Sequence, residues 1–540
     1  MDAVDIIGRF DSLAASRTTV QQEWEDVERY VSPHRGKFLQ DDKSEHSVQW
    51  NDHYRFDSTA VTACQNLSSN IHGALTSPSV RWFALRYRDE KLNKNKQASM
   101  WLESVGDRLQ AELQDSNFDS QINEVYQDLT AFGTGFLTLE EMPGQGWTGF
   151  NFSSVPIKEG YFEEDFMGRV LRFYRKLQWT PQKIMSKFGD KTPQKIKDLE
   201  ADGNTEKLDV LFVIVPRGNK IASVGQRMTQ SRRPWEYGYI LKDDATIIET
   251  GGYYEQIAFA PRWGKTSMSV WGFSPATLAM GDIKSANAAR RLQLSMAEKM
   301  IDPPVFAEEM SILADLDMSS GGLNVVRRID GIEVFNAQGS IPVSDHMITQ
   351  LQDAIKDYFF TDQLQFPRPQ GTPMSATEAQ IRYEQLAKLM APTLGRLQND
   401  MLSPIVARGF KMLVRSGELD PPPESVVESG GDLDIEYLGS LARAQKTDRA
   451  AATERLVASV ANISPVFPNA VDVIDDDAMV RELARDLNIS AAILRDDKEV
   501  TAMREDREAK MQAMQEAQIA EQQGNAAQAQ QAAQQEQPPQ

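Results

Sequence analysis

The sequence predicts an α+β fold. Apolar residues recur at helical spacing before about residue 132, alternate with a period of two from Gly135 to Ile257, and return to helical spacing over most of the remaining chain. Consecutive strands joined by short turns pair antiparallel, so the middle region is expected to be a mostly antiparallel sheet. At 540 residues with 41% hydrophobic residues, the chain is long enough for several domains or one large elaborated fold.

The helices predicted before the sheet are separated by turn signals. Each of the first two ends at a Ser-Pro pair, because the residue before a proline disfavours the helical conformation. The strand RWFALRYR follows the second helix. The helices cover residues 7–31, 58–75, 96–116 and 120–132.

The sheet region contains several segments that alternate between apolar and polar residues. The turn DFMG, Asp165–Gly168, separates two strands, and a short helix near residues 181–187 interrupts the series. The strand segments are GFLTLEEM, GFNFSSVP, GYFEEDFMGRVLRFYRKLQW, KLDVLFVIVPR and EYGYILKD.

The stretch SVWGFSPATLAMGDIKSANAARRLQLSMAEKMIDPPVF, residues 269–306, predicts one long helix with a marked start and a hard stop. Ser274 suits the N-cap and Pro275 the first helical position. The helix can continue to Ile301, where Asp302 and a double proline end it, over a length of about 40 Å. The helix is only weakly amphipathic and too polar for a membrane, so the pattern does not show what it packs against.

A small β-containing insert separates this helix from the next one. Residues 323–344 are strand-like and rich in turns, and DHMITQLQDAIKDYFFTD, residues 345–362, returns to a helical pattern. Residues 302–344 are therefore expected to lie between two long helices. The apolar stripe of the second helix consists of Met347, Leu351, Ile355, Tyr358 and Phe359.

The segment QLQFPRPQGTPMSA, residues 363–376, is rich in proline and glycine and is predicted to be a loop. Ser375 and Glu378 form a capping box at the start of a further long helix. Pro392 and Pro404 are expected to kink or break that helix.

The C-terminal part is predicted to be helical apart from a strand in LDIEYLGSL. The acidic run Asp475–Asp477 fits a helix start, where it complements the helix dipole. Residues 516–540 are rich in glutamine and alanine, lack an apolar face and are expected to be disordered or frayed. The predicted helices cover residues 444–461, 475–487 and 498–520.

Motifs of nucleotide chemistry are incomplete. GQGWTG, residues 144–149, has the spacing of a dinucleotide-binding loop, but strands are predicted on both sides, so a hairpin turn is the better interpretation. GKT, residues 264–266, is similar to the end of a phosphate-binding loop. Phe259 stands where the first glycine of that loop belongs, and no helix follows directly, so a surface loop is expected.

The sequence predicts no catalytic residue, cofactor or metal site. The five histidines show no metal-ligand spacing, and Cys64, as the one cysteine, excludes an internal disulfide. No run of about 18 apolar residues predicts a membrane span, and the N-terminus does not have the pattern of a secretory signal.

The charge balance argues against tight binding of DNA. The formal net charge is −20, whereas a protein that grips phosphates needs concentrated lysine and arginine. DNA could still pass close by without being held. The pairs Arg290-Arg291 and Arg327-Arg328 are either solvated or salt-bridged side chains, or contacts to DNA or a partner.

The order of these elements resembles the portal, or head-to-tail connector, proteins of short-tailed, podovirus-type bacteriophages. The resemblance extends from about Ile6 to Gln515 and rests on three motifs that occur in order: QNLSSNIHGALTSPSVRWFAL, WGFSPATLAMGDIKSAN and MSATEAQIRYEQL. In the second motif, an aromatic-Gly-x-Ser turn opens the long helix. The Gln/Ala-rich tail departs from the family pattern.

The resemblance implies a portal fold with an α/β wing, a two-helix stem, a small β-containing clip and a helical C-terminal crown, assembled as a ring. In a ring, neighbouring copies would supply a packing surface for a stem helix that has no core of its own. The parts map onto the wing at 1–270, the first stem helix at 271–301, the clip at 302–344, the second stem helix at 345–362, the tunnel loop at 363–376, the wing return at 377–440, the crown at 441–515 and the tail at 516–540.

The resemblance also implies site residues. The stem residues are Ser274, Arg290, Arg291, Leu351 and Ile355. The loop that the family places in the tunnel corresponds to Pro367, Arg368, Pro369, Gln370 and Gly371, which would face DNA. Arg327 and Arg328 in the clip are candidates for partner contacts.

Such a protein forms the channel at one capsid vertex through which double-stranded DNA is packaged and ejected, and it joins head to tail. The implied partners are further copies of the chain, normally twelve in all, major capsid and scaffolding proteins, the terminase packaging motor, a tail adaptor, and internal core or ejection proteins. The protein would be made in the host cytoplasm and reside in the virion, with no membrane contact. An acidic channel would let DNA slide, with energy supplied by a separate packaging ATPase.

Two other classes remain open from the residues alone. A helical scaffold or coat protein would not explain a β insert between two helices. A DNA-processing enzyme would need a metal–carboxylate cluster or a full phosphate-binding loop.

Overall fold

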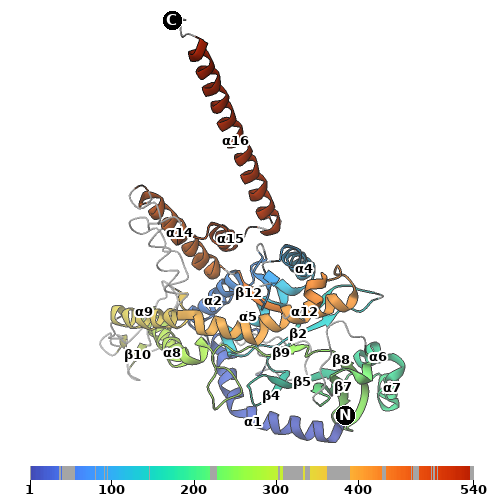
Figure 1. The fold of residues 1–540 in the computed structure, drawn as a ribbon. Helices are drawn as coiled ribbons and strands as arrows, with labels where there is room; N and C mark the ends of the chain where they lie inside the picture. Colours follow the sequence, from blue (N-terminus) through green and yellow to red (C-terminus); the bar gives the residue numbers. More distant parts are fainter. Residues whose placement is uncertain are drawn as a thin grey trace. The chain divides into compact units, whose positions relative to one another are not determined.

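The fold is described from a computed structural model of the chain. The structure describes residues 2–35, 38, 55–78, 81–89, 92–93, 95–144, 146–218, 228–301, 305–307, 332–334, 341–361, 389–428, 433–438, 440–463, 465, 473–487, 489, 493–495 and 497–535. The chain forms two compact units. The first comprises Met1–Trp82 and Leu109–Leu419, and the second comprises Phe83–Arg108 and Asp420–Gln540. Helices and strands occur in both units, so the α+β class is confirmed (Figure 1).

The first unit contains a five-stranded sheet with the strand order β4-β5-β6-β7-β8. Strands adjacent in the sheet are consecutive in the sequence and antiparallel, as the alternating pattern predicts. The predicted turn at Asp165–Gly168 joins β4 to β5, and Gly168 there has φ +78°. The strands are β4 (Gly160–Glu164), β5 (Val170–Trp179), β6 (Leu208–Pro216), β7 (Trp235–Leu241) and β8 (Thr246–Tyr253).

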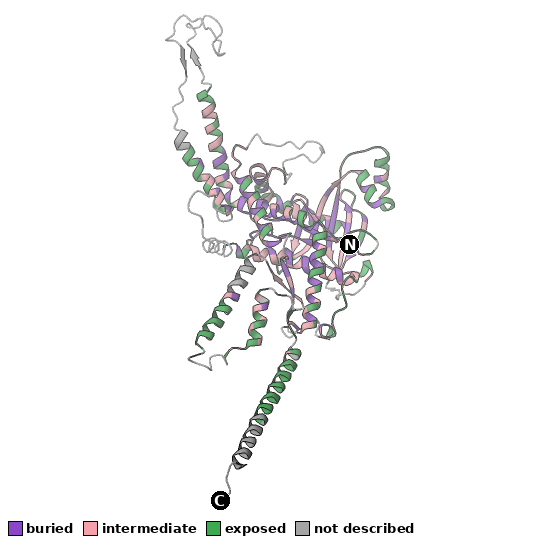
Figure 2. Ribbon diagram, turned by 90° about the horizontal axis from the view of Figure 1, so that it is seen from above, coloured by how far each residue is buried: buried purple, intermediate pink, exposed green. Residues whose placement is uncertain are grey.

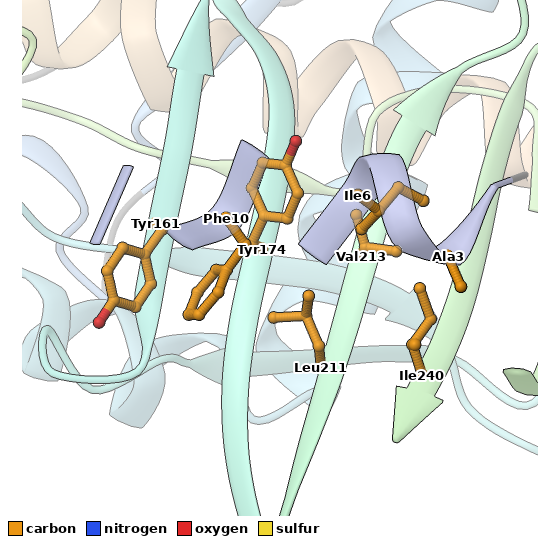
Figure 3. Close-up of a cluster of buried hydrophobic side chains, with 8 residues drawn as sticks. All are labelled: Ala3, Ile6, Phe10, Tyr161, Tyr174, Leu211, Val213 and Ile240. Carbon is orange, nitrogen blue, oxygen red and sulfur yellow. The ribbon is translucent and has the colours of Figure 1, made fainter. Parts of the chain in front are cut away.

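Helix α1 (Ala3–Tyr30) packs on one face of this sheet (Figure 3). Leu211 and Val213 of β6 both contact the helix, because residues two apart on a strand point to the same face. Phe10 lies edge to face against Tyr161, with ring centroids 4.8 Å apart. These apolar contacts form the core that attaches the N-terminal helix to the sheet.

A second sheet has three strands in the order β3-β2-β9. They are β2 (Leu137–Glu141), β3 (Phe150–Ser154) and β9 (Ala258–Phe259). The motif GQGWTG lies in the β2–β3 hairpin, where Glu141 pairs with Phe150. The interpretation as a hairpin turn is therefore confirmed.

Several helices surround the sheets of the first unit. Helix α2 (Thr59–Leu75) packs on α5 (Phe118–Phe132), and α6 (Pro181–Phe188) confirms the short helix predicted within the strand series. Helix α7 (Gln194–Ala201) was not predicted, because its eight residues bury only Ile196 and give little periodic signal. Helix α4 (Lys96–Asp115) continues from the second unit into the first.

Two long helices flank a small hairpin in the sequence. They are α8 (Pro275–Ile301) and α9 (Ile341–Tyr358), which pack on each other, and between them β10 (Val305–Ala307) pairs antiparallel with β11 (Ile332–Val334). The predicted order of helix, β insert and helix is present. Helix α8 starts at Pro275, the first helical position that the sequence predicts, so the stem boundary at residue 271 includes the turn before the helix. Helix α9 starts earlier than the predicted residue 345, with Pro342 in its first turn.

Residues 389–416 form one helical run that contains a π turn, η5 (Gln398–Leu402), directly before α12 (Ser403–Ser416). The Ser403 amide donates to the Gln398 carbonyl, five residues back. Pro404 has no N–H to donate, and the π turn lets the helix continue past it. At Pro404 the expected break is thus a π turn, whereas the described helix runs through Pro392 without a break from 389 to 397. The predicted capping box at Ser375 lies outside the described residues.

The second unit contains a two-stranded antiparallel sheet in which β1 (Phe83–Tyr87) pairs with β12 (Leu433–Tyr437). Both strands were predicted. The helices are α13 (Glu424–Glu428), α14 (Ser440–Ile463), α15 (Asp476–Asp486) and α16 (Asp497–Gln535). Asp475 caps α15, since its carboxylate accepts from the Ala478 amide at 3.0 Å, as the acidic run predicts.

Helix α16 corrects one expectation. It continues to Gln535, so the prediction of disorder from residue 516 is wrong for 516–535. Alanine, glutamine and glutamate have high helix propensities, and a helix satisfies its backbone hydrogen bonds internally without an apolar face. Residues 501–519 are all exposed (Figure 2). No helix within the described ranges is long and apolar enough to cross a membrane.

Candidate functional site

Helix α8 begins where the chain is locked onto the end of α5. Ser274 is fully buried; its hydroxyl donates to the Ala131 carbonyl at 2.7 Å, and the Thr277 amide donates to it at 2.9 Å. The predicted N-cap is therefore confirmed. A Cβ on Gly272 would lie 2.2 Å from the Gly133 carbonyl oxygen, so the close approach of the two backbones requires glycine at this position.

Trp271 anchors the same turn in an aromatic core. Its ring packs edge to face against Trp24 of α1 at 5.1 Å and against Phe162 of β4 at 5.2 Å between centroids. Such pairs contribute about 0.5–1.5 kcal/mol each beyond the area that they bury. The aromatic-Gly-x-Ser turn thus fixes the base and the direction of α8.

Burial divides α8 into two halves. The first half packs on α1, α2 and α5 and buries Pro275, Ala276, Ala279, Ile283, Ala286 and Asn287. From Ala288 to Ile301 no residue is buried (Figure 2). Leu292 and Ile301 are 70% and 84% exposed. The expectation that the helix has no core of its own is wrong for the first half of α8 and holds only for its second half.

The segment before α2 holds the helix pair in place. The Asn287 side-chain oxygen on α8 accepts from the Phe56 amide at 2.6 Å. The Gln352 amide on α9 donates to the Asp57 carboxylate at 2.6 Å. One short segment is therefore bound by both helices.

The two arginines of the pair on α8, Arg290 and Arg291, lie in different surroundings. Arg290 donates to the Gln293 side-chain oxygen at 2.6 Å, and Gln293 in turn donates to Asp345 on α9. Arg290 therefore belongs to a series of hydrogen-bonded side chains that links the two helices. Arg291 is exposed.

The inward face of α9 agrees with the prediction only in part. Ile355 is 1% exposed, Phe359 is fully buried and Leu351 is half-buried. The buried face continues to Ile348, because residues seven apart share one side of a helix. Two predicted members of the stripe are exposed instead: Met347 by 56% and Tyr358 by 42%.

The remaining predicted site residues lie outside the described part of the chain. This holds for the clip residues Arg327 and Arg328. It also holds for the tunnel-loop residues Pro367, Arg368, Pro369, Gln370 and Gly371.

Lys265 of the GKT motif is engaged by the protein itself. Its ammonium contacts the two carboxylate oxygens of Glu164 at 2.7 and 2.6 Å. Arg262 pairs with Glu164 and, at 3.2 Å, with Asp400 in the π turn. This cluster joins β4, the segment before α8 and the π turn. GKT thus lies in a loop, as expected, but only Thr266 of the three residues is exposed.

A second buried cluster attaches α12 to the sheets. Arg415 forms a two-pronged ion pair with Glu255, at 2.5 and 2.8 Å, and Arg408 contacts the same carboxylate at 3.2 Å. Arg408 also donates to the Leu139 carbonyl at 3.1 Å. Burial lowers the pKa of Arg408 to about 10, although Glu255 opposes that shift. Neither cluster could be found from the sequence, since its members are far apart in the chain.

Among the described residues, no group of three His, Cys, Asp or Glu side chains is placed to hold a metal ion. The described geometry is thus a pair of helices, α8 and α9, anchored at the base of α8, in which the second half of α8 has no buried residue.

Comparison with known proteins identifies the class. A family model described as "Bacteriophage head to tail connecting protein" matches residues 3–494, and the chain belongs to this family. The chain is 25% identical over 524 residues to the "Probable portal protein" of Bordetella phage BPP-1, covering 95% of this chain and 92% of the relative. It is 24% identical over 525 residues to the "Portal protein" of Salmonella phage epsilon15, covering 94% and 92%.

The resemblance stated from the sequence motifs is therefore confirmed. The chain is a structural portal protein of a phage virion, with its role at the capsid vertex, and its family and relatives are structural proteins rather than enzymes. The two alternatives, a scaffold or coat protein and a DNA-processing enzyme, are thereby set aside.

Proposed function

We propose that the chain assembles into a closed ring, normally of twelve copies, around a channel for double-stranded DNA. In this proposal α8 and α9 are the stem and residues 302–344 are the clip. Residues 1–270 and 377–440 are the wing, 363–376 the tunnel loop and 441–515 the crown.

The exposed second half of α8 carries the proposal. A helix held at its base by Ser274 and Trp271 projects large apolar side chains, including Leu292 and Ile301, that no described residue of the chain buries. Large exposed apolar surfaces on a folded chain mark contacts with other molecules. Neighbouring copies in a ring would cover this surface.

The charges of the helix pair suit a channel that does not hold DNA. Acidic and basic side chains are interspersed on α8 and α9, for example Glu298 beside Lys299 and Asp357 beside Lys356. Together with the net charge of −20, this leaves no concentrated cationic surface on the pair to bind phosphates. DNA would move past the stem with weak contacts, driven by a separate packaging motor.

The clip and the tunnel loop would supply the contacts to other components. Arg327 and Arg328 would meet the tail adaptor and the terminase motor. Arg368, between Pro367 and Pro369 in the sequence, would make weak contacts with the DNA phosphates. Major capsid and scaffolding proteins would surround the ring, internal core or ejection proteins would meet the crown, and the protein would be made in the host cytoplasm.

The ring is tested by imaging and weighing the purified full-length chain. We expect closed rings with a central hole wide enough for duplex DNA in negative-stain images, and a matching oligomer mass. Purified chain that stays monomeric at every salt and protein concentration, with no ring in any image, would contradict the proposal.

A further inference from the structure

The turn between β4 and β5 presents apolar side chains to solvent. Phe166 and Met167 at its tip are 93% and 64% exposed, and Met268, in the loop that also carries Lys265, is 96% exposed. Met268 and Phe166 are the two most exposed large apolar side chains in the described part of the chain. We call Phe166, Met167 and Met268 the hairpin tip.

The turn that carries Phe166 and Met167 is held by several hydrogen bonds. One carboxylate oxygen of Asp165 accepts from the Met167 amide at 2.8 Å and from the Arg169 amide at 2.9 Å. Arg262 donates to the Gly168 carbonyl at 3.2 Å, which attaches the turn to the segment before α8. A surface presented in a fixed conformation loses little entropy when it binds, so this turn is organised for a contact.

The charges beside the turn are already paired. Arg169 contacts the Asp165 carboxylate at 3.0 Å, and Lys265 contacts Glu164 at 2.6 Å. A phosphate backbone would have to compete with these carboxylates for both cations. The tip therefore suits an apolar protein surface better than a nucleic acid.

We propose that the hairpin tip docks on a second copy of this chain, a contact that rests on the proposed ring. Every copy in a ring has an identical neighbour, so one repeated contact covers the tip of every copy. A head-to-tail ring contact also requires a second, different surface on each copy. The same unit offers one on α8, where Leu278 and Leu292 are 57% and 70% exposed. Aromatic and methionine side chains are enriched at such interfaces.

Substitution of the tip tests the contribution of this contact to assembly. In the Phe166→Ser/Met167→Ser variant, Asp165, Gly168 and Arg169 keep the turn intact. We expect the protein concentration at half-assembly, measured by mass photometry, to rise about tenfold or more, because central aromatic anchors dominate interface energy. The matched control is Met142→Ser, which removes a 45% exposed methionine from another hairpin and should leave assembly unchanged.

A photo-crosslinker identifies the partner directly. Placing p-benzoylphenylalanine at position 166 keeps an aromatic side chain at a solvent-exposed site, so this arm does not depend on a destabilising substitution. We expect illuminated rings to give covalent dimers and higher multimers whose crosslinked peptide belongs to this chain. Well-formed rings with no crosslink, with a crosslink to DNA or another protein, or with unchanged half-assembly of the serine variant would overturn this inference and leave the ring standing. Absence of rings in the wild-type protein would overturn both.

Discussion

Arg17 shows how one buried cation can join distant segments of the chain. It lies in α1 with 2% exposure and donates to the carbonyls of Gly160 and Lys158 at 3.0 Å each. Its guanidinium also stands 3.7 Å from the ring centroid of Tyr161. Burial lowers the pKa of Arg17 to about 10. The carbonyl oxygens and the aromatic face of Tyr161 stabilise the positive charge of the guanidinium.

Cys64 is expected to resist thiol reagents in the folded protein. Its sulfur is buried, 3.3 Å from the Thr130 hydroxyl oxygen, and burial raises its pKa from 9.0 to about 11. A raised pKa leaves less thiolate at neutral pH than an ordinary thiol has, and the thiolate is the reactive form.

The measurement is the rate of reaction with an aromatic disulfide at neutral pH, in buffer and in denaturant. Labelling should be slow in the folded chain and fast after unfolding. Rapid, complete labelling of the folded chain would show that Cys64 is accessible and its thiolate populated.

At the scale of elements, the packing of α1 on the five-stranded sheet depends on Phe10. This side chain is 1% exposed and contacts Tyr161 and Tyr174. Phe10→Ala should therefore lower the free energy of unfolding by about 3–5 kcal/mol, through lost burial and a residual cavity.

Urea titration followed by circular dichroism measures this loss. Val4→Ala, on the same helix at a position that is 71% exposed, is the matched control and should change stability by no more than about 0.5 kcal/mol. Equal effects of the two substitutions would mean that α1 is not held by its apolar face.

Elements with a long periodic signal could be predicted from the sequence. The strand series up to β7, the helices before it, and the helix–insert–helix order around α8 all follow from spacing and turn residues, whereas β8 and β9 were not among the predicted strands. Helix α7 is short and nearly featureless. Helix α7 was therefore not predicted. The π turn depends on how the chain accommodates Pro404, where the sequence predicted only a kink or break. Helix α16 depends on helix propensity alone, so the lack of an apolar face led to a wrong prediction of disorder.

The site could be predicted less completely than the fold. Ser274 was identifiable because an N-cap is a local feature of the sequence. The ion clusters around Glu164 and Glu255 bring together side chains that are distant in the chain, and nothing in one sequence shows which charges meet. The exposed half of α8 likewise becomes visible only when the burial of each residue is known.

At the scale of the whole molecule, the net charge of −20 opposes the binding of free DNA. We expect no saturable binding of short duplex DNA by micromolar protein at near-physiological salt, about 0.15 M, because long-range repulsion between acidic protein and phosphate opposes association. Fluorescence anisotropy of a labelled duplex measures this. Binding that weakens steeply with added salt would instead reveal a concentrated cationic surface.

The pairing of β1 with β12 determines when the second unit can be completed during synthesis. Leu85 pairs with Ile435, and most of the first unit lies between them in the chain. The two-stranded sheet therefore cannot form until the ribosome has passed residue 437, and pairing between such distant segments is slow. Until then Phe83 and Tyr87, which are buried in the finished protein, have no partner strand. This is the interval in which a nascent chain is most open to aggregation and most dependent on chaperones.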